Sequence, residues 1–90
     1  MNKRDLVDAV AARTGGPKTD AAVAVDAVFS AITDAMKKRD KVAISGFGAF
    51  EARFVNERMA RNPRTGEPIP VPAHYAPKFK PGKGLKDAIS

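Results

Sequence analysis

Prolines stand at alternate positions, 68, 70 and 72, in the segment RNPRTGEPIPVP of residues 61–72. Proline cannot donate a backbone hydrogen bond, so a strand containing it must lie at the edge of a sheet, with those positions facing away from its partner. A spacing of two places all three missing donors on one edge and leaves Ile69 and Val71 to donate inward. A central strand cannot accommodate this pattern, whereas a two-stranded hairpin can. The prolines also keep that free edge from recruiting other chains.

The residues before these prolines are typical of a tight turn. Pro63 presets the second turn position, Asn62 can bond its own backbone, and Gly66 supplies a left-handed exit. With EARFV before the turn and IPVPA after it, we expect a β-hairpin arm over residues 53–76, which we call the arm. An isolated hairpin is marginally stable in water, so the arm is expected to be mobile until a ligand orders it. A polyproline II spacer is the competing interpretation of PIPVP.

The first forty residues have the period of helices. Asn2 is a plausible N-cap with Asp5 in the first turn. An apolar stripe then runs to Gly15-Gly16, which ends the first helix. A second helix is expected to begin with Pro17 at its first position and to run to about Lys38. Its apolar face is wide and consists of Ala21, Ala22, Val25, Val28, Phe29, Ile32 and Met36.

After residue 40 the apolar period changes from 3.6 to 2. KVAI predicts a short strand, SGFG a turn, AFEARFV a second strand and PKF a short return strand, and Gly82 precedes a last amphipathic helix. The expected fold is α+β: an N-terminal helical hairpin, a small antiparallel sheet extended into the arm, and a short C-terminal helix. We expect one domain, 1–90, with a helical dimerisation base at 1–40, the sheet and arm at 41–81 and the last helix at 82–90.

The chain has little with which to build a core by itself. Large apolar residues are scarce from Val55 to Ala76, which leaves only about seventy residues for a core, a marginal size for such a fold. Its five phenylalanines present more aromatic surface than a thin monomer would hide: Phe29, Phe47, Phe50, Phe54 and Phe79. These features favour a homodimer with a shared core over a monomer with a small one.

Net positive charge is concentrated in the second half of the chain. The formal net charge is +6, and residues 53–90 hold eight Lys and Arg against three Asp and Glu, whereas residues 1–52 hold eight against seven. This asymmetry favours a polyanionic partner, and a basic surface kept for solubility is the alternative. Cysteine is absent, which excludes disulfides and thiolate chemistry. No apolar run reaches signal-peptide or membrane length, so a cytoplasmic protein is expected.

The arm presents groups suited to duplex DNA. Four arginines are spread along it, Arg53, Arg58, Arg61 and Arg64, and Pro63 lies at its tip. Arginines hold phosphates or lie in a narrow minor groove, and a rigid apolar proline can wedge between base pairs and kink the duplex. An ordinary turn proline on a basic hairpin is the simpler interpretation.

Other classes of function have less support. His74 is the only histidine, so a metal pair or a Ser-His arrangement is absent, and GFG and GKG lack the context of a phosphate-binding loop. We therefore expect no enzyme, cofactor or metal. Recognition of single-stranded RNA stacks bases on exposed aromatics, and the basic half offers only Tyr75 outside the expected core. A role of PIPVP as a proline-rich ligand stays open.

Three motifs resemble those of the family of the bacterial histone-like protein HU and integration host factor: GFGAF at 46–50, RNPRTG at 61–66 and PKFKPGKGLKDAI at 77–89. The resemblance extends over the whole chain. It implies an intertwined dimer with a helical base and a sheet saddle, from which two arms reach around duplex DNA through the minor groove. It further implies bending and compaction of DNA in the nucleoid.

The resemblance also implies roles for individual residues. Pro63 corresponds to the wedge, with Arg61 and Asn62 beside it, while Arg53, Arg58 and Arg64 line the arm. Lys3, Lys18 and Lys83 match basic positions that face the DNA flanks. Phe47, Phe50 and Phe79 match the shared aromatic core, and we expect Phe29 to join it. The chain departs from the family at Glu67 and the three arm prolines, where many relatives have lysines.

Within this family, the opening residues MNKRDLVDAV and the end of the chain directly after the last helix look more like HU. The likeness to HU implies little sequence preference, whereas integration host factor binds particular sites as a heterodimer. We expect a homodimer of this chain, in which a paralogue could replace one copy. The alternative is a site-specific subunit like that of integration host factor, and an RNA-binding module is less favoured.

Overall fold

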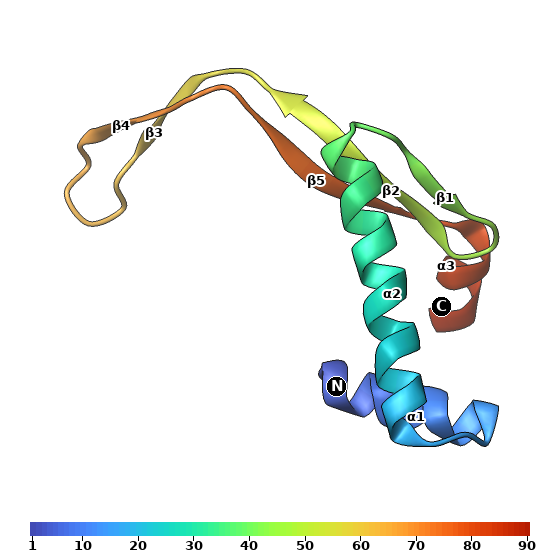
Figure 1. The fold of residues 1–90 in the computed structure, drawn as a ribbon. Coiled ribbons are helices and arrows are strands. Elements are labelled where there is room, and N and C mark those ends of the chain that lie inside the picture. Colours follow the sequence, from blue (N-terminus) through green and yellow to red (C-terminus); the bar gives the residue numbers. More distant parts are fainter. The chain divides into compact units, whose positions relative to one another are not determined.

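A computed structural model describes residues 1–90, which form two compact units, Met1–Ala35 and Met36–Ser90 (Figure 1). The order of elements is α1, α2, β1 to β5 and α3. This agrees with the expected α+β fold, in which helices come first and the strands follow.

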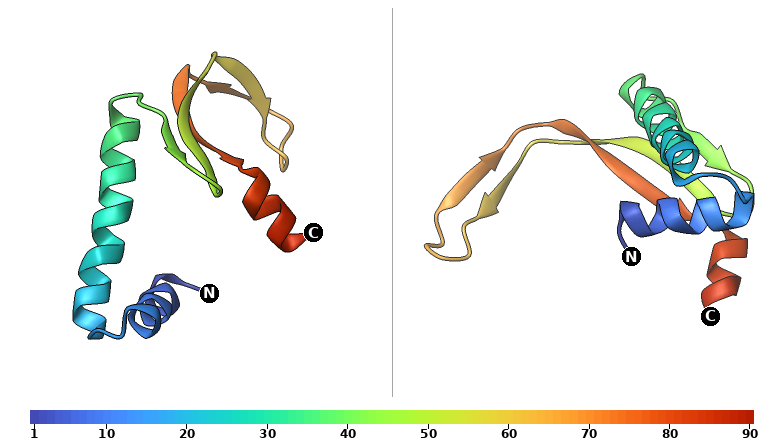
Figure 2. Two further views of the ribbon diagram at one scale, coloured as in Figure 1. Left: turned by 90° about the vertical axis from the view of Figure 1, so that its right-hand side faces the viewer. Right: turned by 60° about the horizontal axis from the view of Figure 1, so that its bottom comes forward.

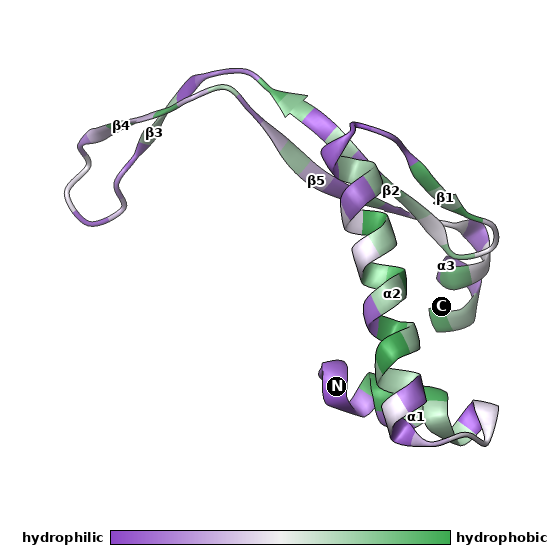
Figure 3. Ribbon diagram, in the orientation of Figure 1, coloured by the Kyte–Doolittle hydropathy of each residue, from purple (hydrophilic) through white to green (hydrophobic).

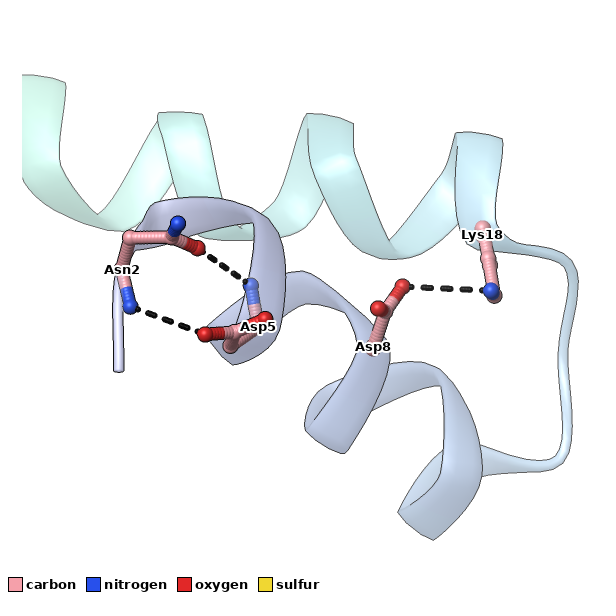
Figure 4. Close-up of polar contacts among 4 residues, drawn as sticks. All are labelled: Asn2, Asp5, Asp8 and Lys18. Atoms are coloured by element: carbon pink, nitrogen blue, oxygen red, sulfur yellow. Dashed lines mark hydrogen bonds and ion pairs between the residues drawn. The ribbon is translucent and has the colours of Figure 1, made fainter.

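The first unit is built from helix α1 (Lys3–Thr14) and most of helix α2 (Lys18–Lys37). Asn2 and Asp5 form a reciprocal capping box: the Asp5 amide donates to Asn2 Oδ1 at 2.9 Å, and the Asn2 amide donates to Asp5 Oδ2 at 3.2 Å (Figure 4). Such a cap satisfies two amides that the helix leaves unpaired. Pro17 lies just before α2 rather than at its first position, and its carbonyl accepts from the Ala21 amide.

The buried core of the first unit is small. Only four residues are buried in the whole chain, and all four come from α1 and α2: Val7, Ala11, Ala21 and Val25. Two alanines among the four allow the helices to approach closely, but they bury little area. The hydrophobic effect scales with buried apolar area, so this core contributes only a modest stabilisation.

The second unit contains a three-stranded antiparallel sheet in the order β1-β2-β5, with β1 at Val42–Ile44, β2 at Gly48–Val55 and β5 at His74–Pro81. Strand β5 pairs with β2 along its whole length and lies at the sheet edge, where Pro77 and Pro81 are tolerated. The sequence predicted only the PKF portion of β5. The strand begins earlier because His74, Tyr75 and Ala76 continue the ladder opposite Val55, Phe54 and Arg53.

Helix α3 (Lys83–Ile89) follows β5 directly. Its start lies against the turn between β1 and β2, where the Gly82 amide donates to the Phe47 carbonyl at 2.7 Å. A Cβ atom at Gly84 would come within 2.5 Å of the Gly46 carbonyl oxygen, so only glycine fits this position. The GFG and GKG motifs are therefore used for close backbone packing.

Strands β3 (Arg58–Arg61) and β4 (Pro68–Val71) form a separate two-stranded ladder that continues the direction of β2 and β5 away from β1 (Figures 1 and 2). The expected β-hairpin is thereby confirmed, and the polyproline II spacer is wrong. The Asn62 amide donates to the Glu67 carbonyl at 2.9 Å. Because bonded and non-bonded pairs alternate in an antiparallel ladder, Ile69 and Val71 take bonded positions and Pro68 and Pro70 do not.

The aromatic side chains form clusters, but none is buried. Phe79 contacts Phe47 and Phe50, with ring centroids 5.5 and 4.8 Å apart. In the isolated chain Phe47 is 44% exposed, Phe79 40% and Phe29, on α2, 46%. Apolar residues recur along α2 and β1, whereas the hairpin tip is largely polar (Figure 3). A single chain thus leaves uncovered the residues that were expected to form a core.

Candidate nucleic-acid interface

The tip of the arm is held by its own backbone and side-chain bonds. The Arg64 amide donates to Asn62 Oδ1 at 2.9 Å, the Gly66 amide donates to the Asn62 carbonyl at 2.8 Å, and the Glu67 amide donates to Thr65 Oγ1 at 3.3 Å. Gly66 has φ of 74°, the left-handed exit that the turn requires. Asn62 is therefore engaged in shaping the turn, and Pro63 is presented exposed at its apex.

The four arginines of the arm are exposed and form no ion pair. Arg58 and Arg61 lie on β3, Arg53 lies on β2 opposite Ala76, and Arg64 lies in the tip turn. Side chains alternate between the faces of a strand, so Arg58 and Arg61, three residues apart, point to opposite faces of the hairpin. The arm thus carries uncompensated positive charge on both faces.

The three lysines expected on the body differ from the arm arginines. Lys3 Nζ lies 2.7 Å from Asp26 Oδ1, and Lys18 Nζ lies 3.3 Å from Asp8 Oδ1 (Figure 4 shows the second pair). Lys83, the first residue of α3, forms no ion pair. Lys3 and Lys18 belong to the first unit and Lys83 to the second. Two of the three cations are therefore partly neutralised by a carboxylate of the same unit.

One contact at the base of the arm was not predicted from the sequence. The Arg39 guanidinium carbon lies 3.8 Å from the centroid of the Tyr75 ring, and Tyr75 packs edge-on against Phe54 with 5.4 Å between centroids. Arg39 follows α2 at a position where glycine is usual, since it adopts a positive φ of 65°. The signal in the sequence is an arginine just after a helix, at a position where glycine is usual. That signal could have indicated this contact.

The remaining polar residues do not converge on a reactive site. His74 is exposed, and its Nδ1 lies 2.9 Å from the Pro72 carbonyl oxygen. No group of three or more His, Asp or Glu side chains is placed to hold a metal ion. None of the three helices combines the length and the apolar character that a membrane span requires.

A family model described as bacterial DNA-binding protein matches residues 1–90. The chain belongs to this family. It is 55% identical over 89 residues to the DNA-binding protein HU of Geobacillus stearothermophilus, with 99% of each chain covered. It is 52% identical over 90 residues to the DNA-binding protein HU 1 of Bacillus subtilis, with 100% of this chain and 98% of the relative covered.

Solved structures of this family have the same fold. An Anabaena HU–DNA cocrystal structure matches with a TM-score of 0.91 at 39% identity, covering 100% of this chain and 98% of that one. HU from Thermotoga maritima matches with a TM-score of 0.70 at 36% identity over 100% of both chains. The resemblance inferred from GFGAF, RNPRTG and PKFKPGKGLKDAI is confirmed.

Proposed function

We propose that this chain is an architectural DNA-binding protein, which binds duplex DNA with little sequence preference and bends it. The observation that carries the proposal is the tip of the arm, where an exposed Pro63 stands between Arg61 and Arg64 and no carboxylate pairs with either. The relatives are named as DNA-binding proteins HU, and one similar structure is a cocrystal with DNA. Membership of this family gives no support to an enzyme.

In the proposed complex the residues of the arm have different roles. Pro63 enters between neighbouring base pairs from the minor groove, and Arg61, Arg58, Arg53 and Arg64 lie along the phosphates or in the groove. Asn62 was expected to lie beside the wedge as a contact residue. Its backbone and side-chain bonds support a different part, that of holding Pro63 at the apex. Lys3, Lys18 and Lys83 contact the flanks of a bent duplex.

The proposed functional unit is a homodimer. Phe47, Phe50 and Phe79 already cluster on the sheet, and Phe29 is half-exposed on α2. A second copy would cover these side chains and provide the core that one chain lacks. A paralogue could take the place of the second copy, and the proposed location is the nucleoid.

Bending is tested by fluorescence energy transfer on end-labelled duplexes that are intact, nicked or mismatched, across a salt series. Binding should weaken steeply with salt as counterions are released. Nicked and mismatched duplexes should bind more tightly, because part of a deformation cost of about 1–6 kcal/mol is already met. Pro63→Ala should reduce the bend more than the affinity, whereas Arg61→Ala should reduce both.

Three outcomes would contradict the proposal. If Pro63→Ala leaves the bend angle unchanged, Pro63 does not act as a wedge between base pairs. Tighter binding to a particular sequence than to matched random duplexes favours a site-specific protein like integration host factor. Competition between duplex DNA and RNA at the same salt concentration tests the RNA-binding alternative. That alternative predicts that RNA displaces duplex DNA from the protein.

A further inference from the structure

A second cluster lies where the arm leaves the sheet. The ladder between β2 and β5 ends with the pairs Phe54–Tyr75 and Val55–His74, and pairing resumes only at Arg58–Val71. We call these last two pairs of the β2–β5 ladder the root of the arm. Two-stranded ribbons are weak alone, so the swing of the arm is governed by whatever holds its root.

Arg39 is held in place by several groups at once. Its amide donates to the Met36 carbonyl at 3.0 Å, and its Nη1 donates to the Lys37 carbonyl at 3.1 Å, with the Met36 carbonyl 3.5 Å away. The planar guanidinium at the same time covers the Tyr75 ring at 3.8 Å. The side chain therefore connects the last carbonyls of α2 to a strand of the arm root.

The backbone of Arg39 supports a specific role for this contact. Arg39 is the only residue other than glycine with a positive φ in the chain. A left-handed conformation is unfavourable for a residue with a Cβ atom and persists where surrounding contacts impose it. Glycine would end the helix without this strain, but it would provide no guanidinium to cover the ring.

The Tyr75 ring also contacts Phe54. The two rings meet edge to face at 71°, and Tyr75 and Phe54 remain 46% and 53% exposed. No carboxylate pairs with Arg39, so its charge stays available to the face of the ring. Arg39, Tyr75 and Phe54 thus form one cluster across both strands of the root.

We propose that Arg39 is a positioning residue for the arm: by stacking on Tyr75 it braces the root, restricts the swing of the tip and narrows the range of DNA bends. Only the claim about DNA bends rests on the proposed function. The brace itself is a property of the free protein.

Arm motion is measured first, in the free protein, by backbone nitrogen-15 relaxation. Arg39→Gly removes the guanidinium and keeps the left-handed turn, and Tyr75→Ala removes the ring. Both should lower the order parameters of the tip amides of Arg64 and Gly66 toward values below about 0.6, which mark flexible backbone. Tyr75→Phe keeps the ring and should match the parent protein.

Separate control measurements distinguish loss of the stacking contact from a change in net charge and from a loss of folding stability. Lys38→Ala removes a neighbouring positive charge that does not stack on the Tyr75 ring, so it should leave tip order unchanged. Circular dichroism of Arg39→Gly should give a melting temperature no lower than that of the parent. In the double variant of Arg39→Gly and Tyr75→Ala, tip order should fall no further than in Tyr75→Ala alone, because without the ring Arg39 has nothing on which to stack.

The DNA half is then measured as a distribution of bend angles by single-molecule energy transfer. Arg39→Gly should broaden the distribution and change affinity no more than Lys38→Ala does. Unchanged tip order in both Arg39→Gly and Tyr75→Ala overturns the brace, as does equal loosening by Lys38→Ala. If Arg39→Gly lowers tip order but leaves the distribution of bend angles unchanged, the link between the brace and DNA bending is wrong. Failure of the parent protein to bend DNA overturns the proposed function, while the relaxation result still decides the brace.

Discussion

At the scale of single residues, the basic side chains fall into two electrostatic classes. The arm arginines are unpaired, whereas Lys3 and Lys18 each lie against an aspartate of the same helical unit. Both pairs are well exposed, and such pairs contribute little to folding stability. Their larger effect is on binding, because a phosphate must displace the carboxylate before it can use the lysine.

Asp26→Asn should therefore tighten the binding of a duplex long enough to reach Lys3. An exposed ion pair is worth about 0.2–1 kcal/mol, so the gain should be at most roughly fivefold. The matched control is Asp34→Asn, which makes the same charge change on α2 where no ion pair exists. Titrations at fixed salt concentration measure both, and equal gains in the two variants would show that only net charge matters.

At the scale of elements, the arm is a hairpin whose two edges differ. The inner positions of β4 are taken by Ile69 and Val71, opposite Ala60 and Arg58, while Pro68 and Pro70 face outward. The prolines therefore cost the ladder no hydrogen bond. They also leave the outer edge without donors that another chain could use.

Moving a proline by one position should accelerate amide exchange in the arm, whereas replacing one of the existing prolines should not. Ile69→Pro deletes a bonding amide, which is worth about 1 kcal/mol, so exchange of the Ala60 amide should accelerate roughly fivefold. Pro70→Ala should leave that rate within about twofold, because no ladder bond is changed. Hydrogen exchange followed by NMR compares the two variants. If Pro70→Ala accelerates exchange as much as Ile69→Pro, Pro70 does not face outward.

At the scale of the whole molecule, one chain has too little core. Four buried residues, two of them alanine, contrast with half-exposed phenylalanines on both units. Large exposed apolar surfaces mark interaction sites in stable proteins. This imbalance is the physical basis for the proposed homodimer.

Phe79→Ala should lower the melting temperature strongly, since Phe-to-Ala changes in a core cost about 3–5 kcal/mol, and the melting temperature of the dimeric parent should rise with protein concentration. Met59→Ala is the control, because Met59 is an exposed apolar residue of the arm, outside the aromatic cluster. Calorimetry at several concentrations, with sedimentation of the parent protein, measures both effects. A folded monomer of the parent at micromolar concentration would refute the dimer.

Local chemistry made much of this fold predictable. The cap at Asn2, the end of α1 at Gly15 and the turn at Asn62–Gly66 depend on residues near each other in sequence, and all three occur as expected. The start of β5 was missed because His74 and Tyr75 lie in a polar, proline-rich stretch. Only the opposite strand, β2, determines that they are paired.

The sequence by itself determined the elements and the arm with its arginines and Pro63, because periodicity, capping, proline and glycine act over a few residues. The tertiary structure decided which charges are free and which are paired. It also placed Arg39 on a ring that is distant in sequence. These features depend on how segments meet in space, and residue types alone do not specify such contacts.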